Sequence, residues 1–135
     1  MRQHTGGHGV PKRAGLRALP QPQLGGLDPT LHHGTFNAIF LPAVIAFKAD
    51  AESVRRERRQ ERMAQAMGLA ATEDIGPAIR ALNARLGLPR GLTELGVRRD
   101  PFERIIDGAL ADHCQRTNPR TASREDYRAM LEASM

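Results

Sequence analysis

The chain has 135 residues, of which 40% are hydrophobic and only 4% aromatic, and it carries a net charge of +5. This length supports one domain at most, or part of a larger one. The scarcity of aromatic residues argues against a stacking platform for single-stranded nucleic acid, whereas the positive charge keeps a polyanionic partner in view. A single cysteine, Cys114, excludes an internal disulfide and a cysteine-based zinc site.

Two sequence signals bear on the location of the protein. No apolar run approaches the roughly 20 residues that a transmembrane helix needs. The N-terminus also lacks the apolar core of a signal peptide. From these features we expect a soluble, cytoplasmic protein without a membrane partner.

The first part of the chain, residues 1–27, is rich in Gly, Pro, Arg, His and Gln. Its composition predicts an irregular segment attached loosely to the rest of the protein. His4 and His8 have the spacing of two metal ligands on a helix, but Gly6 and Gly7 lie between them and disfavour a helix. We therefore interpret this histidine pair as a chance occurrence.

The segment from Gly34 to Ala49 is apolar on most sides, which predicts a buried helix. Pro42 lies inside it and is expected to kink or restart the helix, because proline has no N–H to donate. The next segment, Asp50 to Leu69, is amphipathic, carries many arginines and is expected to form one helix. Its inward-facing residues are expected to be Val54, Met63, Ala64 and Met67. The segment fits either a nucleic-acid-binding stripe or a solvated helix face, and the interspersed glutamates favour the solvated face.

Three further helices are expected. The first runs from Thr72 to Leu86, with Thr72 as the cap. Its inward face is expected to consist of Ile75, Ala78, Ile79, Leu82 and Leu86. The second begins at Asp100, with Glu103 completing a capping box, and its apolar stripe ends at His113. The third covers residues 123–133. Because no segment of useful length alternates as a strand does, the predicted class is all-α: a multi-helical, bundle-like domain preceded by an irregular Gly/Pro-rich segment.

The sequence offers few residues suited to catalysis or metal binding, and His33 is the one candidate. This histidine lies at the start of the predicted buried helix, and Gly34 after it permits close approach of backbone or ligand. A metal site needs roughly three or four ligands, so an isolated histidine is more often structural. On the residues alone, both interpretations stay open, and the same holds for His113.

The stretch from His33 to Pro42 resembles the His-Gly-x-x-Asn-Ala-x-x-Leu-Pro signature of the iron-containing (group III) alcohol dehydrogenases. Later pieces follow in the family's order. These are Met67-Gly68-Leu69, Leu86-Gly87-Leu88-Pro89, Leu95-Gly96-Val97 and Thr117-Asn118-Pro119-Arg120. Lys48 departs from the asparagine that is common in the family. The resemblance covers residues 24–135, which we expect to form part of the helical metal-binding-type domain.

The resemblance implies a two-domain enzyme that interconverts an alcohol and an aldehyde or ketone with NAD(P) and a divalent metal, iron or zinc. One Asp and three His hold the metal in such enzymes, and His33 matches the last of these ligands. Another should lie near Leu19, where this chain has no histidine. By this comparison the chain lacks most of the ligand set, so we expect it to bind no metal or NAD(P) tightly.

The N-terminal segment suggests why a ligand is missing. Arg2 to Gly26 can be encoded by codons that also encode a second peptide when they are read one nucleotide further on. That second peptide is similar to the family's sequence just before the signature. We hypothesise that residues 1–23 are translated out of frame. The gene's nucleotide sequence decides this question.

The sequence therefore predicts a truncated, inactive member of the alcohol dehydrogenases. The alternative is a basic helical interaction module that binds nucleic acid or protein, which the mixed charges disfavour. Without a partner domain, such a chain is also expected to expose apolar surface and to self-associate.

Overall fold

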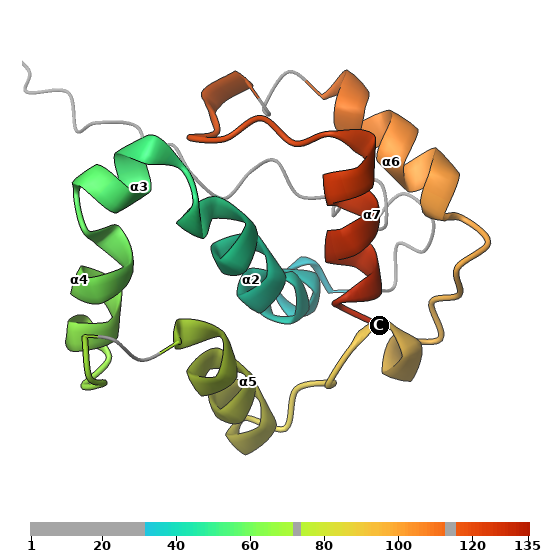
Figure 1. Cartoon of the computed structure of the whole chain (residues 1–135). Coiled ribbons are helices and arrows are strands. Elements are labelled where there is room, and N and C mark those ends of the chain that lie inside the picture. The colour runs from blue at the N-terminus through green and yellow to red at the C-terminus, as the bar shows by residue number, and fades with distance from the viewer. Residues whose placement is uncertain (1–31, 72–73, 113–115) are drawn as a thin grey trace, which may run out of the picture.

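The computed structural model describes residues 32–71, 74–112 and 116–135, and this part of the chain is helical and contains no β-strand (Figure 1). The all-α prediction is therefore confirmed. In chain order the elements are α2 (His33–Ala49), α3 (Glu52–Arg56), α4 (Arg59–Ala66), α5 (Ile75–Arg85), the 3-10 helix η1 (Leu92–Leu95), α6 (Phe102–Ala111) and α7 (Arg124–Glu132).

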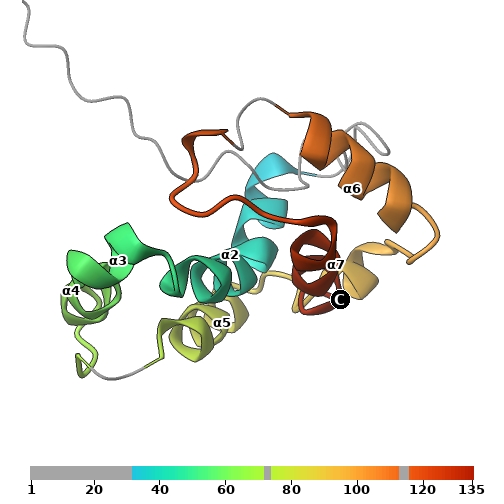
Figure 2. The ribbon, with the colours of Figure 1, turned by 45° about the horizontal axis from the view of Figure 1, so that its top comes forward.

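Helix α2 is the centre of the fold, as its apolar sequence predicts. It runs between α5 on one side and α7 on the other, and it contacts both (Figure 2). Phe36 and Phe40 on one face of α2 enter the main core, while Leu41 and Ile45 on another face pack against a second, smaller core. A helix with apolar partners on two sides needs apolar residues nearly all round, which is the pattern that the sequence shows.

The main core joins α2 to α6, α7 and η1. Its fully buried side chains include Tyr127, Ile106 and Leu92. The smaller core joins α2 to α4 and α5 through Ala64, Ile75 and Ile79. The molecule therefore has a larger lobe on one side of α2 and a smaller one on the other, with α2 shared by both.

Pro42 does not restart the helix, because α2 continues through it to Ala49. The missing N–H of Pro42 leaves the carbonyl of Ala38, four residues earlier, without its usual helical donor. The side-chain amide of Asn83 on α5 donates a hydrogen bond to this carbonyl at 2.8 Å. A partner helix thus supplies the bond that the proline removes.

The predicted single helix over 50–69 is wrong, because the structure divides it into α3 and α4. The division lies at Arg58, whose backbone is left-handed with φ 51° and ψ 40°. No glycine or proline marks this position, so neither periodicity nor turn residues could reveal it. Val54 and Ala64 are buried as expected.

Two predicted helix starts differ from the observed ones. Helix α6 has Pro101 rather than Asp100 as its N-cap, and no side chain caps it. Helix α5 is capped by Asp74, whose Oδ1 accepts a hydrogen bond from the N–H of Gly76 at 2.9 Å. Thr72, the expected cap, lies outside the described residues. The capping box occurs at α7 instead, between Ser123 and Asp126.

Four apolar side chains expected to face inward are exposed. They are Met63 and Met67 on and after α4, and Leu82 and Leu86 on and after α5. Each pair is four residues apart and follows the helical period, but the buried side of each helix is narrower than the apolar pattern suggests. The sequence therefore indicates an apolar face on each of these segments but overestimates the part of that face that is covered.

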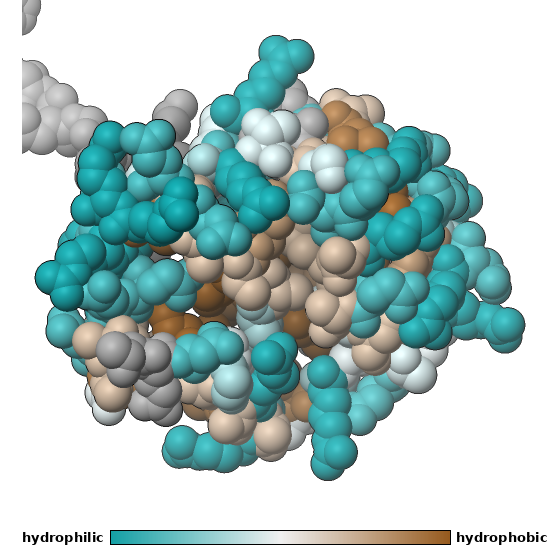
Figure 3. Space-filling view, viewed as in Figure 1, coloured by the Kyte–Doolittle hydropathy of each residue, from teal (hydrophilic) through white to brown (hydrophobic). Residues whose placement is uncertain are grey.

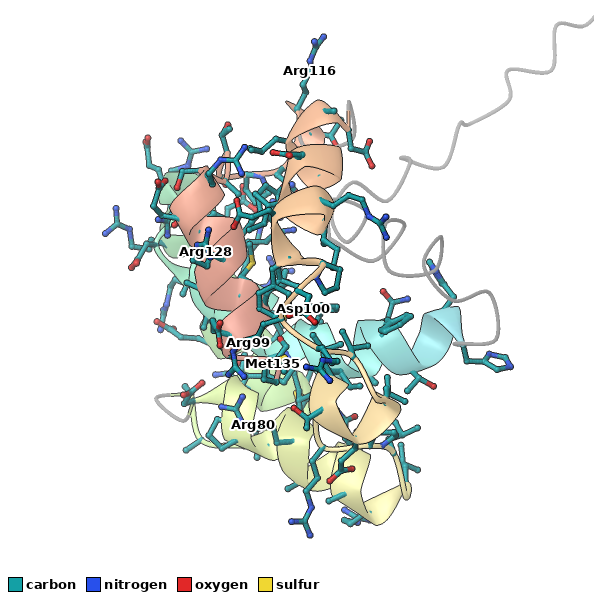
Figure 4. The ribbon with its side chains drawn as sticks, turned by 90° about the vertical axis from the view of Figure 1, so that its right-hand side faces the viewer. Arg80, Arg99, Asp100, Arg116, Arg128 and Met135 are labelled. Carbon is teal, nitrogen blue, oxygen red and sulfur yellow. The ribbon has the colours of Figure 1, made fainter. Side chains whose placement is uncertain are left out.

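The C-terminal residues are anchored to η1. The carbonyl of Ser134 accepts a hydrogen bond from the N–H of Leu92 at 2.8 Å, and that of Met135 accepts one from Thr93 at 3.2 Å. Gly91 lies against this contact, where a Cβ would come within 2.3 Å of the Met135 oxygen. Figure 4 shows Met135 beside Arg99, close to the end of α7.

Candidate functional site

His33 is the first residue of α2 and is exposed, as is His32 before it. The position of α2 fixes where the His33 backbone lies, because Phe36 and Phe40 anchor the same helix in the core. Among the described residues, a Cβ built on Gly34 would meet nothing within 4 Å. The expectation of room for a ligand beside His33 therefore agrees with the described surroundings.

The electrostatic setting of His33 favours anions more than cations. A helix N-terminus carries partial positive charge, and the first turn of α2 contains no acidic residue to offset it. A divalent metal held at this point would therefore need a carboxylate from elsewhere in the protein.

The described residues do not complete a metal site. Among them, no group of three or more His, Cys, Asp or Glu side chains is placed to hold a metal ion. The other histidines singled out from the sequence, His4, His8 and His113, lie outside the described residues, as does Leu19. The role of His33 as a metal ligand consequently stays a prediction.

The opposite end of α2 carries a second polar cluster. Lys48 donates a hydrogen bond from Nζ to Oδ1 of Asn118 at 3.0 Å, and burial lowers the pKa of Lys48 from its ordinary value of 10.5. Arg120 donates from Nη1 to the carbonyl of Phe47 at 2.9 Å and stacks over the Phe47 ring at 4.1 Å. It also pairs with Asp126 at the start of α7. The Thr117–Arg120 motif therefore fastens the end of α2 to α7.

Beside Lys48 lies a pocket of about 670 Å³ between α2, α3 and α4. Its apolar wall consists of Leu41, Val44, Ile45, Val54, Met63 and Ala66. Figure 3 shows hydrophobic side chains at the bottom of a hollow on this side of the molecule, bordered by hydrophilic ones. Sequence reasoning missed this feature, because it treated Lys48 only as a departure from the family's asparagine.

Three of the five arginines in the α3–α4 segment form ion pairs with neighbouring glutamates. Arg56 lies 3.9 Å from Glu52, Arg59 lies 2.7 Å from Glu57, and Arg58 pairs with Glu61. These pairs place arginines beside glutamates on an exposed face of the protein. Among the described residues, no helix combines the length and the apolar character needed to cross a membrane.

Comparison with known proteins identifies the family. The sequence model described as "Fe-containing alcohol dehydrogenase family, C-terminal" matches residues 23–135. The chain belongs to the iron-containing alcohol dehydrogenase family. The helical fold described above is thus that of the family's C-terminal region, as the resemblance of the His33–Pro42 stretch implied.

Individual relatives agree with this assignment. A 4-hydroxybutyrate dehydrogenase of Cupriavidus necator is 51% identical over 124 residues, covering 89% of this chain and 32% of that protein. An NAD-dependent methanol dehydrogenase of Bacillus methanolicus is 30% identical over 117 residues, covering 84% of this chain and 30% of that protein. A crystal structure of 1,3-propanediol oxidoreductase superposes with a TM-score of 0.76 at 29% identity, covering 90% of this chain and 32% of that one.

The chain spans about a third of the length of these dehydrogenase relatives. The activities in the names of these relatives belong to the whole proteins.

Proposed function

We propose that this chain provides the helical C-terminal part of a metal-dependent, NAD(P)-linked alcohol dehydrogenase, and that His33 supplies one ligand to its iron or zinc. The reaction would interconvert an alcohol and its aldehyde or ketone. The observation that carries the proposal is the position of the His33–Pro42 signature: its histidine is exposed at the end of the helix that organises the whole fold.

The named functions of the relatives support the same reaction class. One is a 4-hydroxybutyrate dehydrogenase and another an NAD-dependent methanol dehydrogenase, so both oxidise an alcohol carbon. Their names differ in substrate, and the described residues of this chain do not distinguish between such substrates.

A histidine on a firmly anchored helix suits a metal ligand. Phe36 and Phe40 are almost fully buried, at 1% and 0% exposure, and hold the first turns of α2 against α6 and α7. Anchoring of this kind fixes the position from which the imidazole projects. Residues beyond the described ones would have to bring the remaining ligands.

We infer that these 135 residues alone do not catalyse the reaction. One imidazole binds a divalent ion weakly, because metal affinity grows with the number of ligands held together. Incubated with NAD(P)⁺, Fe²⁺ or Zn²⁺ and 4-hydroxybutyrate, the purified chain should produce no NAD(P)H above the buffer rate. Turnover, or tight binding of one metal ion per chain in calorimetry, would contradict this inference.

A chimera tests the role of His33 directly. Residues 24–135 would replace the corresponding part of the Cupriavidus necator 4-hydroxybutyrate dehydrogenase, so that the rest of that enzyme supplies what these residues lack. We expect the chimera to bind iron or zinc and to reduce NAD⁺ in the presence of 4-hydroxybutyrate.

His33→Ala should then lower the metal content and the activity of the chimera at least about a hundredfold, because it removes a direct ligand. His32→Ala is the matched control: it removes an equally exposed imidazole one residue away and should leave both quantities near the parent values. Equal losses in the two variants, or a loss only in His32→Ala, would refute the assignment of His33.

A further inference from the structure

The helix that carries His33 has one gap in its hydrogen bonding, at Pro42. Helix α2 continues through this residue, although the proline cannot donate to the Ala38 carbonyl and its ring crowds that carbonyl. Proline is the commonest cause of a sharp kink in a helix. The segment from Ala38 to Pro42 is therefore the part of α2 at which the helix axis bends most easily.

A small bend at this point produces a large movement at His33. Pro42 follows His33 by nine positions, which corresponds to about 13 Å along the helix axis. Over that length, a change of about 5° in the bend displaces the His33 backbone by about 1 Å, and a change of about 20° displaces it by roughly 4 to 5 Å. A metal ligand has to be held within about 0.5 Å of its productive position. The bend of α2 therefore needs tighter control than a helix containing a proline provides by itself.

Two kinds of contact hold α2 from different sides. Phe36 and Phe40 are buried in the main core with residues of α6 and α7. Helix α5 packs on another side of α2, as Figure 2 shows, and Asn83 of α5 donates from Nδ2 to the Ala38 carbonyl at 2.8 Å. Apolar burial is non-directional, whereas a hydrogen bond fixes the orientation of its acceptor. The Asn83 bond therefore controls the direction of the axis in a way that the core contacts do not.

Asn83 is itself held by the end of α5. Its backbone carbonyl accepts a hydrogen bond from the N–H of Leu88 at 3.0 Å, and Gly87 between them has the left-handed φ of 70°. One turn before Asn83, the side chain of Ile79 is buried in the smaller core. The donor is thus fixed by a capped helix end and a core contact, and its bond reaches the weakest point of α2.

We propose that Asn83 is a positioning residue for His33, because its hydrogen bond to the Ala38 carbonyl sets the direction in which the N-terminal half of α2 extends from Pro42. The consequence for metal binding rests on the proposed function of His33, whereas the effect on the direction of α2 does not. A residue that only stabilised the fold would change the free energy of unfolding without changing where the folded helix points.

The first test measures the direction of α2 in the full 135-residue chain without metal. In a Cys114→Ala background, nitroxide labels are attached at His32→Cys together with either Ala129→Cys on α7 or Ala81→Cys on α5, all of which are exposed positions. Electron paramagnetic resonance gives the two distance distributions. Asn83→Ala should shift or broaden at least one of them by about 2 Å or more, because it releases the bend at Pro42.

A second substitution should reverse this effect. In Pro42→Ala/Asn83→Ala the restored backbone N–H can bond to the Ala38 carbonyl, so both distance distributions should return to those of the parent chain. Ile79→Val is the matched control: it removes one buried methylene from the same helix and leaves the Asn83 bond in place, so it should lower stability without changing either distribution. If Asn83→Ala does not fold, Asn83→Asp replaces it, because an ionised carboxylate has the same shape and no donor.

The second test uses the chimera with the Cupriavidus necator enzyme. Asn83→Ala should weaken its affinity for Zn²⁺ about tenfold in competition with a chelator, as expected for a residue that orients a ligand, and Pro42→Ala should restore the affinity. Unchanged distances in Asn83→Ala, a shift that Pro42→Ala does not reverse, or the same shift in Ile79→Val would overturn the proposal. So would an unchanged affinity in Asn83→Ala when His33→Ala lowers it. If His33→Ala leaves the affinity unchanged, the proposed function of His33 fails, and the distances alone decide whether Asn83 directs α2.

Discussion

Asn83 on α5 supplies a hydrogen bond that Pro42 removes from α2. A proline inside a buried helix normally costs a hydrogen bond, because it cannot donate to the carbonyl four residues before it. Here the amide of Asn83 reaches across from α5 to that carbonyl, on Ala38, at 2.8 Å. The signature residue Pro42 is therefore tolerated because a side chain 41 positions later completes the bond.

Asn83→Ala should lower the free energy of unfolding by about 1–2 kcal/mol, since it leaves the Ala38 carbonyl without this donor. Urea denaturation followed by circular dichroism measures the change. In a Pro42→Ala background the restored N–H can bond to Ala38, so the same Asn83→Ala change should cost about 1 kcal/mol less. Equal costs in the two backgrounds would show that Asn83 acts independently of the proline.

Gly91 illustrates a different constraint at the residue scale. Its backbone is extended, with φ −167°, so any residue could adopt its conformation. The difficulty is space, because a Cβ would lie 2.3 Å from the Met135 oxygen and 2.6 Å from its carbonyl carbon. Both obstructing atoms are backbone and can move only by separating η1 from the C-terminal residues.

Gly91→Ala should therefore destabilise the protein by about 2 kcal/mol, a cost typical of overpacking. Gly34→Ala is the control: that glycine has open space around it and lies in α2, so alanine should be neutral or stabilising by up to about 1 kcal/mol. Thermal unfolding of the two variants gives the comparison. A neutral Gly91→Ala would mean that the C-terminal residues do not need their contact with η1.

At the scale of elements, several motifs that carry the family resemblance are helix ends. After α4, Gly68 has φ 75°, and the N–H of Leu69 bonds back to the Ala64 carbonyl at 2.9 Å. After α5, Gly87 has φ 70°, and the N–H of Leu88 bonds to Asn83 at 3.0 Å. Glycine is favoured at such caps because it adopts a left-handed backbone without penalty.

These elements show what the sequence could predict and what it could not. The glycine caps and the apolar character of α2 follow local rules, so the helix ends at Gly68 and Gly87 and the buried centre were predictable. The division at Arg58 was not, because no local residue signals it. The exposure of Met67 and Leu86 could not be predicted either. Periodicity indicates that a helix has an apolar face, but it does not indicate whether another element covers that face.

The left-handed backbone of Arg58 gives a prediction for the junction of α3 and α4. A non-glycine residue with positive φ is strained, so Arg58→Gly should raise the melting temperature by about 4 °C. The variant also loses the exposed pair with Glu61, which contributes little. Arg58→Ala loses the same pair but keeps the strain, and it should not be more stable than the parent. An alanine variant as stable as the glycine one would refute this account.

At the scale of the whole molecule, the sequence predicted only one residue of the candidate site. His33 followed from the signature, and its exposure at the end of α2 agrees with a ligand role that stays a prediction. The positive helix end beside it was also predictable, because the sequence already places His33 at the start of the buried helix. The pocket beside Lys48 depends instead on how α2, α3 and α4 pack, so no linear motif could reveal it.

The exposed apolar side chains lead to a prediction about association. Leu82 and Leu86 are 43% and 65% exposed, and Met63 and Met67 are 37% and 42% exposed on and after the neighbouring helix α4. Exposed apolar side chains favour contact with another surface. We therefore expect the purified chain to self-associate through some of these side chains.

Leu82→Glu/Leu86→Glu should weaken self-association at least about tenfold, because burying a leucine contributes about 1.5–3 kcal/mol, and a charge in an apolar contact opposes it. Sedimentation equilibrium over a concentration series gives the dissociation constant. Ala81→Glu is the control, since it adds a charge at an exposed position of α5 without removing a large apolar side chain. Association of the parent chain should persist at high salt, which screens ion pairs but not apolar contacts. Dissociation by salt, or equal association of the double variant and the parent, would point instead to the charged faces of α3 and α4.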